Sequence, residues 1–138
     1  MTNQRKLRFI KITCWVGILA DALWAVALFS PGLYGLLIGK PDFNPDASFR
    51  ANMVIGALLM TAWTLLLLWT WQKPVERKAV LLLTAYPITS GLFLLSSANV
   101  YLGVTMFGDA VWIMAKTLTL TIIFTTSFIF GRQLEQID

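Results

Sequence analysis

Apolar residues fill four long stretches of the chain, and short stretches rich in proline, glycine and charged residues separate them. A helix needs about 20 residues to cross the roughly 30 Å of hydrocarbon in a bilayer. Each apolar stretch reaches about that length, at residues 9–30, 51–71, 79–102 and 110–130. The pattern therefore predicts an all-α integral membrane protein, a bundle of four transmembrane helices without a sheet.

The segments between the spans are short and leave no room for a separate soluble domain. Turn-forming residues mark them in SPGLYG, GKPDFNPD, QKPVERK and YLGVTMFGD. The apolar stretch GLYGLLIG, after Pro31, is too short to cross the bilayer, so we expect it to lie at the membrane interface or to fold back over the bundle. Residues 1–138 are accordingly predicted to form a single four-helix transmembrane domain.

The overall composition agrees with a chain that lies in a membrane. Hydrophobic residues make up 57% of the sequence, only 13% is charged, and the mean hydropathy is +0.71. The chain has no histidine and a single cysteine, Cys14. These counts exclude a two-histidine metal centre, a Ser-His-Asp triad, a haem with axial histidine and an intrachain disulfide. We therefore expect no metal, no cofactor and no catalytic residue of a familiar kind.

The basic residues flank the spans instead of following one polar face. The basic side chains, which give the chain a net charge of +4, are therefore expected to interact with anionic membrane lipids and not with nucleic acid. Basic residues near span ends remain on the cytoplasmic side of a membrane. Two basic residues, Lys40 and Arg50, lie on one side of the predicted spans. The opposite side carries Arg5, Lys6, Arg8, Lys11, Lys73, Arg77, Lys78 and Arg132. Both termini are thus predicted to be cytoplasmic, in a multi-pass protein of the cell (inner) membrane.

Two charged residues lie deep inside the predicted spans, Asp21 in the first and Lys116 in the fourth. With the amino terminus inside, Asp21 is about 18 Å above the cytoplasmic edge, and Lys116 on the descending span is about 21 Å above it. A lone charge at such a depth costs about 2.5–3.5 kcal/mol on insertion-derived scales. The matching depths predict that the two side chains face the bundle interior and form an ion pair.

Other polar and aromatic residues fall near this pair at helical spacing. Trp24 shares a helix face with Asp21, and Trp112 shares a face with Lys116. The predicted ligand- or proton-binding residues are Asp21, Trp24, Asn52, Trp63, Trp112 and Lys116. The residues predicted to form an outer vestibule are Arg50, Asn99, Tyr101 and Asp109. Together they predict a pocket that opens to the outer side of the membrane and has the ion pair at its inner end.

Each of these features also has a purely structural interpretation. A buried Asp–Lys pair can serve only to fix which helix packs on which. Asp109 can be a helix cap, because it begins the fourth span. Pro87 is expected to be a tolerated kink in the third span. The threonines at 117, 119, 121, 125 and 126 surround their helix, so most are expected to donate to the helix backbone and not to form a proton wire.

Three functions remain open at this stage. The first is ligand binding, or ion- or proton-coupled transport of a small solute or amphiphile, at Asp21 and Lys116. The second is a structural or accessory subunit that packs in a larger membrane complex. The third is an enzyme that modifies a lipid or an isoprenoid. This hypothesis is the weakest of the three, because the sequence has no metal or phosphate motif. Four short-looped helices enclose little space, so a homo-oligomer or a larger membrane complex is expected.

Overall fold

The computed structural model describes residues 2–103 and 106–136, apart from the side chain of Asp109. Within that part of the chain 84% of the residues are helical and no strand occurs, so the predicted all-α class is confirmed. The chain divides into two compact units. Unit 1 comprises Met1–Thr13 and Lys73–Asp138, and unit 2 comprises Cys14–Gln72.

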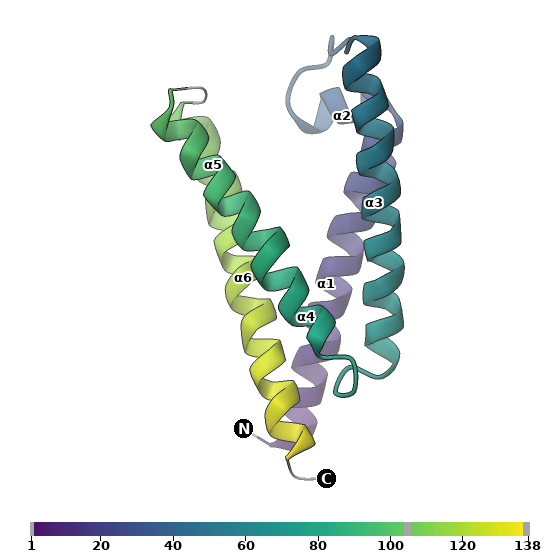
Figure 1. Cartoon of the computed structure of the whole chain (residues 1–138), viewed down its shortest axis with the longest axis vertical. Coiled ribbons are helices and arrows are strands. Elements are labelled where there is room, and N and C mark those ends of the chain that lie inside the picture. Colours follow the sequence, from purple (N-terminus) through teal and green to yellow (C-terminus); the bar gives the residue numbers. More distant parts are fainter. Residues whose placement is uncertain (1, 104–105, 137–138) are drawn as a thin grey trace. The chain divides into compact units, whose positions relative to one another are not determined.

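Seven helical elements follow one another in the described chain (Figure 1). They are α1 (Asn3–Phe29), α2 (Pro31–Leu37), α3 (Ala47–Gln72), α4 (Ala79–Leu83), η1 (Thr84–Ser90), α5 (Gly91–Tyr101) and α6 (Phe107–Glu135). In hydrocarbon every backbone N–H and C=O must be satisfied within the protein, which is why long apolar stretches become helices.

Four helices of the described chain are long and apolar enough to cross a membrane, which confirms the number of spans predicted from the sequence. They are Asn3–Phe29, Ala47–Gln72, Ala79–Tyr101 and Ala110–Glu135. The third combines α4, η1 and α5. The first, second and fourth extend beyond a predicted end because polar turns next to their apolar stretches are helical too.

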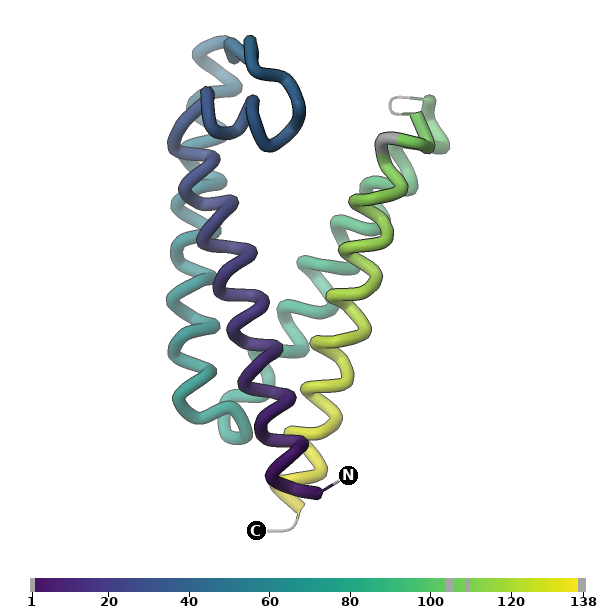
Figure 2. The backbone as a smooth tube through the Cα atoms, turned by 180° about the vertical axis from the view of Figure 1, so that it is seen from behind, coloured from purple at the N-terminus to yellow at the C-terminus, as the bar shows by residue number. Residues whose placement is uncertain are grey.

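In unit 2, α3 lies beside the part of α1 that begins at Cys14 (Figures 1 and 2). Gly56 of α3 permits close packing of the two helices, because a Cβ added at this position would lie only 3.4 Å from Cδ1 of Leu28 in α1. Toward the other ends of these two helices, the rings of Trp15 and Trp71 meet edge to face with centroids 5.8 Å apart. Contacts at both ends therefore hold the two helices together.

Within unit 2, the short helix α2 folds back toward α1 and α3, and its Tyr34 ring contacts those of Trp24 and Phe49. Pro31 occupies its first turn, where a missing N–H costs no helical hydrogen bond. After the helix, Gly39 has φ of +72°, and the Lys40 N–H donates to the Gly35 carbonyl over 2.7 Å. A Cβ at Gly35 would lie 2.5 Å from the Lys40 carbonyl oxygen and 2.8 Å from Cβ of Phe43. The turn closes this tightly because Gly35 has no side chain.

In unit 1, α6 packs along the span formed by α4, η1 and α5, and the first turns of α1 lie beside the end of α6 (Figure 2). On α6, four buried positions repeat every seven residues, namely Ala110, Thr117, Phe124 and Gly131. Ser127 is buried as well. All of these residues except Phe124 are small, which allows helices to approach closely in lipid.

Two side-chain contacts attach the beginning of α1 to α6 in unit 1. The rings of Phe9 and Phe130 meet edge to face with centroids 5.6 Å apart. One turn further along α1, the buried Ser127 hydroxyl donates a hydrogen bond to the buried Thr13 hydroxyl over 2.8 Å. The first and last described turns of the chain therefore lie at the same end of unit 1.

The third span contains a wider, π-helical turn, η1, around Pro87. Proline has no N–H, and its ring collides with the carbonyl one turn earlier, so the normal helical ladder cannot continue through it. The Thr89 hydroxyl donates to the Ala85 carbonyl over 2.8 Å, and its oxygen also lies 2.8 Å from the Thr121 hydroxyl of α6. The irregularity predicted at Pro87 is thus a local widening that a neighbouring helix supports.

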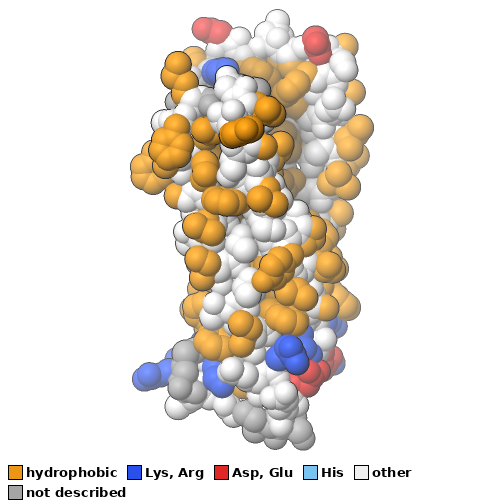
Figure 3. Space-filling model, turned by 60° about the vertical axis from the view of Figure 1, so that its left-hand side comes forward, with side chains coloured by type: hydrophobic (Ala, Val, Ile, Leu, Met, Phe, Trp, Pro, Cys, Tyr) orange, Lys and Arg blue, Asp and Glu red, His pale blue; other side chains and the backbone are white. Residues whose placement is uncertain are grey.

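The surface is apolar along the spans and charged toward their ends. On the face in Figure 3, hydrophobic side chains occupy the middle, and Lys and Arg gather mainly at the lower end. Large apolar side chains are open to the surroundings on several helices, with Leu19, Leu59 and Leu94 exposed by 64%, 67% and 65%. Such a surface suits hydrocarbon and not water.

Candidate functional site

Asp21 lies in the middle of α1, in the part that belongs to unit 2, and its side chain is half-buried. Among the described residues of unit 2, no side chain forms a hydrogen bond or an ion pair with its carboxylate. An isolated charge in an apolar helix is costly. The carboxylate therefore needs a cation, a hydrogen-bond donor or a proton from outside its own unit.

Trp24 follows Asp21 by one turn on the same face of α1 and belongs to a group of four aromatic rings in unit 2. The ring of Trp24 meets that of Tyr34 edge to face, with centroids 6.2 Å apart. The Tyr34 ring lies 5.2 Å from that of Phe43 and 6.5 Å from that of Phe49. The rings of Phe43 and Phe49 are 5.6 Å apart. We call these four residues the aromatic cluster.

The sequence pattern indicates a role for Trp24 and for none of the other residues in the aromatic cluster. Tyr34, Phe43 and Phe49 come together because the chain reverses at Gly35 and Gly39, and no helical period links them. The available signal was the presence of three aromatic residues in a short segment rich in proline and glycine. Each ring beside a turn is a candidate for packing onto the preceding helix.

The α3 residues predicted for the site lie next to the packed face of that helix. The buried residues of α3 are Met53, Ala57, Leu67 and Thr70. Asn52, one position before the first of them, is exposed, and Trp63 is half-buried. Their part in a binding site stays a prediction.

Lys116 lies in the middle of α6 in unit 1, and its side chain is exposed. Trp112, exposed by 73%, and the exposed Thr119 share its face, which differs from the face that packs inside unit 1. Among the described residues of unit 1, no side chain forms an ion pair with Lys116. Lys116 thus resembles Asp21 in having no partner of opposite charge within its own unit.

The predicted ion pair joins residues of two different units. Asp21 belongs to unit 2 and Lys116 to unit 1. The contact between these two residues therefore stays a prediction, as does the pocket above it.

The predicted vestibule is likewise divided between the units. Arg50 of unit 2 is exposed at the beginning of α3. It borders a shallow, open depression lined by Asn44, Pro45, Ala47, Arg50, Ala51 and Val54. In unit 1, Asn99 is half-buried and Tyr101 is exposed by 90% at the end of α5. The side chain of Asp109 lies outside the described part of the chain, so its predicted roles in the vestibule and as a cap stay predictions.

The hydroxyl groups of α6 mostly bond to their own helix, as the sequence predicted. Thr117, Thr119, Thr121 and Thr126 each donate to the carbonyl oxygen four residues earlier, over 2.8 Å. These bonds satisfy each hydroxyl locally and form no continuous chain across the span. Within residues 2–103 and 106–136, no group of three or more His, Cys, Asp or Glu side chains could hold a metal ion.

Comparisons with known proteins give no functional assignment. No protein-family model, no curated protein and no solved structure matches the chain. The chemistry must therefore be argued from the residues. Unit 2 offers a carboxylate one turn from aromatic rings, which can receive a cation, and unit 1 offers an ammonium group, which can receive an anion.

Proposed function

We propose that the chain is a multi-pass membrane protein that binds a small polar or amphiphilic solute at Asp21 and Lys116 and couples this binding to an ion or a proton. One observation carries the proposal. Each of these two charges lies in the middle of an apolar helix and has no partner among the described residues of its own unit. Charged residues inside membrane spans are rare and mark solute or proton pathways.

The depths of the two charges in their predicted spans support the pairing. With the two spans running in opposite directions, Asp21 lies about 18 Å and Lys116 about 21 Å from the same membrane edge, counted at about 1.5 Å per residue. We therefore propose that the two side chains neutralise each other when no solute is bound.

Such a pair selects its solute by charge. A solute that approaches Asp21 must bring a cation or a donor, and one that approaches Lys116 must bring an anion or an acceptor. The aromatic ring of Trp24, one turn from Asp21, supplies a face for the apolar body of an amphiphile or for a cation. Protonation of Asp21 removes its charge, so binding of a cation should weaken as the pH falls below the range in which Asp21 is ionised.

Binding to the detergent-purified full-length protein tests the proposal. We would titrate three probes by calorimetry: tetraphenylphosphonium as a lipophilic cation, octanoate as an amphiphilic anion and glycine betaine as a zwitterion. Proton release or uptake would be recorded in a weakly buffered sample. We expect at least one probe to bind, with a proton change that disappears in Asp21→Asn and an affinity that falls at least about tenfold in Lys116→Met.

Matched controls are available outside the spans. Asp42→Asn and Lys40→Met make the same chemical changes at exposed positions of the connection between α2 and α3, so both should bind like the unaltered protein. Equal binding by Asp21→Asn and Asp42→Asn would contradict the proposal. Failure of all three probes to bind would also count against it and would favour the structural or accessory subunit.

A further inference from the structure

Three segments of unit 1 meet at the end where the first and last described turns of the chain lie. They are the first turns of α1, the connection at residues 73–78 and the last turns of α6. The Phe9–Phe130 ring contact joins the two helices, and an ion pair of 2.6 Å between Lys78 and Glu135 joins the connection to α6. We call this region the basic end.

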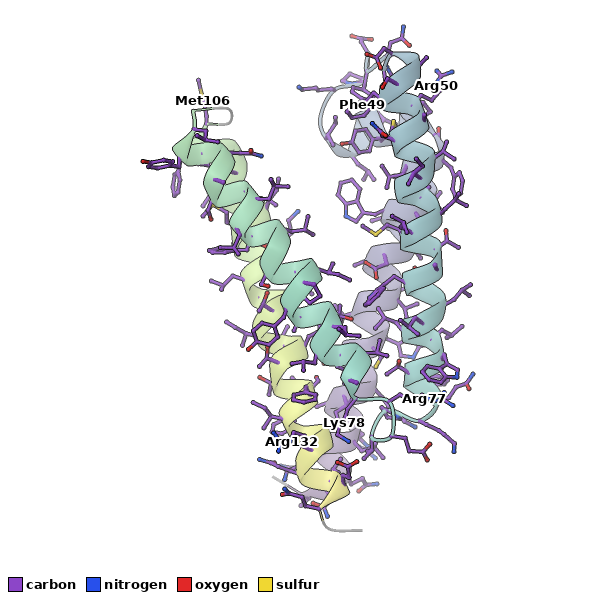
Figure 4. All side chains as sticks on the ribbon, in the orientation of Figure 1. Phe49, Arg50, Arg77, Lys78, Met106 and Arg132 are labelled. Carbon is purple, nitrogen blue, oxygen red and sulfur yellow. The ribbon has the colours of Figure 1, made fainter. Side chains whose placement is uncertain are left out.

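The connection is held closely against α6. A Cβ added at Gly131 would lie 3.1 Å from Cβ and 3.4 Å from Cδ of Lys78, so the aliphatic part of Lys78 packs on the bare backbone of α6. Its side chain is only 16% exposed. Figure 4 shows Lys78 with Arg77 and Arg132 at this end of unit 1. These contacts hold Lys78 against α6.

The basic end carries a large excess of positive charge. Its basic residues are Arg5, Lys6, Arg8, Lys11, Lys73, Arg77, Lys78 and Arg132. Its described acidic residues are Glu76 and Glu135. Each acid already has a lysine partner, since Glu76 lies 3.1 Å from Lys73 and Glu135 lies 2.6 Å from Lys78. The basic residues of this end thus outnumber its described acidic residues by eight to two.

Four of the remaining cations have no hydrogen-bond or ion-pair partner among the described residues. They are Arg5, Lys6, Arg8 and Arg132. The three arginines are exposed. Arg5 and Arg8 are three residues apart and share a face of α1, while Arg132 lies in the last turn of α6. A guanidinium group binds a phosphate through two parallel hydrogen bonds, which makes three exposed arginines a good match for phosphate.

The position of these arginines points to a phosphate that belongs to a lipid. In α1 the apolar part begins directly after Arg8, with Phe9 and Ile10, and Arg132 directly follows the apolar part of α6. The arginines therefore lie where a spanning helix meets the headgroups of a bilayer. We infer that the basic end of unit 1 binds the phosphate group of an anionic phospholipid through Arg5, Arg8 and Arg132. This inference does not depend on the proposed function of Asp21 and Lys116.

Lipid retention by the purified full-length protein tests the inference. Native mass spectrometry would count the lipids that stay bound in mixed micelles of detergent with dioleoylphosphatidylglycerol or, separately, dioleoylphosphatidylcholine. We expect selective retention of the anionic lipid. A basic residue near an anionic surface contributes roughly a fivefold gain in affinity, so the double variant Arg8→Gln with Arg132→Gln should bind phosphatidylglycerol roughly 25-fold more weakly.

The control removes the same number of charges elsewhere. Lys40→Gln with Arg50→Gln alters two exposed cations of unit 2 and should retain the anionic lipid within about twofold of the unaltered protein. A circular dichroism spectrum would show that both double variants remain helical. Equal loss in the two double variants, or equal retention of the two lipids, would overturn the inference. Inorganic phosphate that binds as tightly as the lipid, or an oligonucleotide that displaces it, would also overturn the assignment to lipid.

Discussion

The Ser127 hydroxyl of α6 donates a hydrogen bond to the Thr13 hydroxyl of α1 over 2.8 Å, although the two residues are 114 positions apart. Thr13 in turn donates to the carbonyl oxygen of Phe9 over 3.1 Å. Both side chains are buried, so water does not compete for these bonds. This short relay is a direct polar connection between the beginning and the end of the chain.

Ser127→Ala should lower the free energy of unfolding by about 0.6–1 kcal/mol, because it removes the only donor to Thr13 that the relay contains. The loss should be modest because Thr13 keeps its bond to Phe9. Thr126→Ala is the control, since the Thr126 hydroxyl bonds only to the Ile122 carbonyl of its own helix. Unfolding in sodium dodecyl sulfate would measure both. An equal effect of the two changes would show that the bond to Thr13 contributes nothing specific.

Gly35→Ala should destabilise the fold-back of α2 by about 1–3 kcal/mol. The new Cβ would lie 2.5 Å from the Lys40 carbonyl oxygen and 2.8 Å from Cβ of Phe43, so the turn must open and the aromatic cluster must shift. Gly32→Ala in the same helix is the control, because a Cβ there meets nothing within 4 Å. Thermal unfolding followed by tryptophan fluorescence would compare them. A stability loss that is no greater for Gly35→Ala than for Gly32→Ala would contradict the role given to Gly35.

The four long apolar helices could be predicted from the sequence because length and hydropathy alone decide them. The local bonding of the α6 threonines could also be predicted, since it depends only on the helix that carries them. Which face of α6 packs inside unit 1 could not. In lipid both faces of a helix are apolar, so the small residues Ala110, Thr117 and Gly131 do not stand out by hydropathy.

The candidate site likewise contains residues that the sequence alone identifies and residues that only the tertiary fold brings together. The sequence identified Asp21 and Lys116, because a charge within an apolar stretch needs no structural context to be conspicuous. It missed Tyr34, Phe43 and Phe49, which the chain reversal at Gly35 brings toward Trp24. Aromatic residues in a loop carry no periodic signal, and only the turn determines which helix they meet.

The distribution of basic residues predicts which ends of the helices face the cytoplasm. Asn44 and Gln72 are both exposed; Asn44 lies shortly before α3 begins, and Gln72 is the last residue of that helix. In a Cys14→Ala background, Asn44→Cys should react with a membrane-impermeant maleimide on intact cells. Gln72→Cys should react only after the membrane is opened. Labelling in the reverse pattern would invert the topology.

The proposed ion pair should appear as an energetic coupling between Asp21 and Lys116. If each charge is neutralised by the other, Asp21→Leu or Lys116→Met alone leaves one unpaired charge in an apolar environment. Each should then lower the free energy of unfolding by about 3–5 kcal/mol. The double variant should be close to neutral, because it removes both charges together. Unfolding of all four proteins in sodium dodecyl sulfate would give the coupling as a double-mutant cycle.

A second cycle with Lys40→Met in place of Lys116→Met is the control. Lys40 is exposed in the connection between α2 and α3, so its loss should add to that of Asp21→Leu without coupling. Additive losses in the Lys116 cycle as well would refute the pair. A strong coupling accompanied by an unchanged solute affinity would assign the pair to assembly, because the charges would then hold the helices without meeting a ligand. Strong coupling together with loss of solute binding in the stable double variant is the result that the proposed function requires.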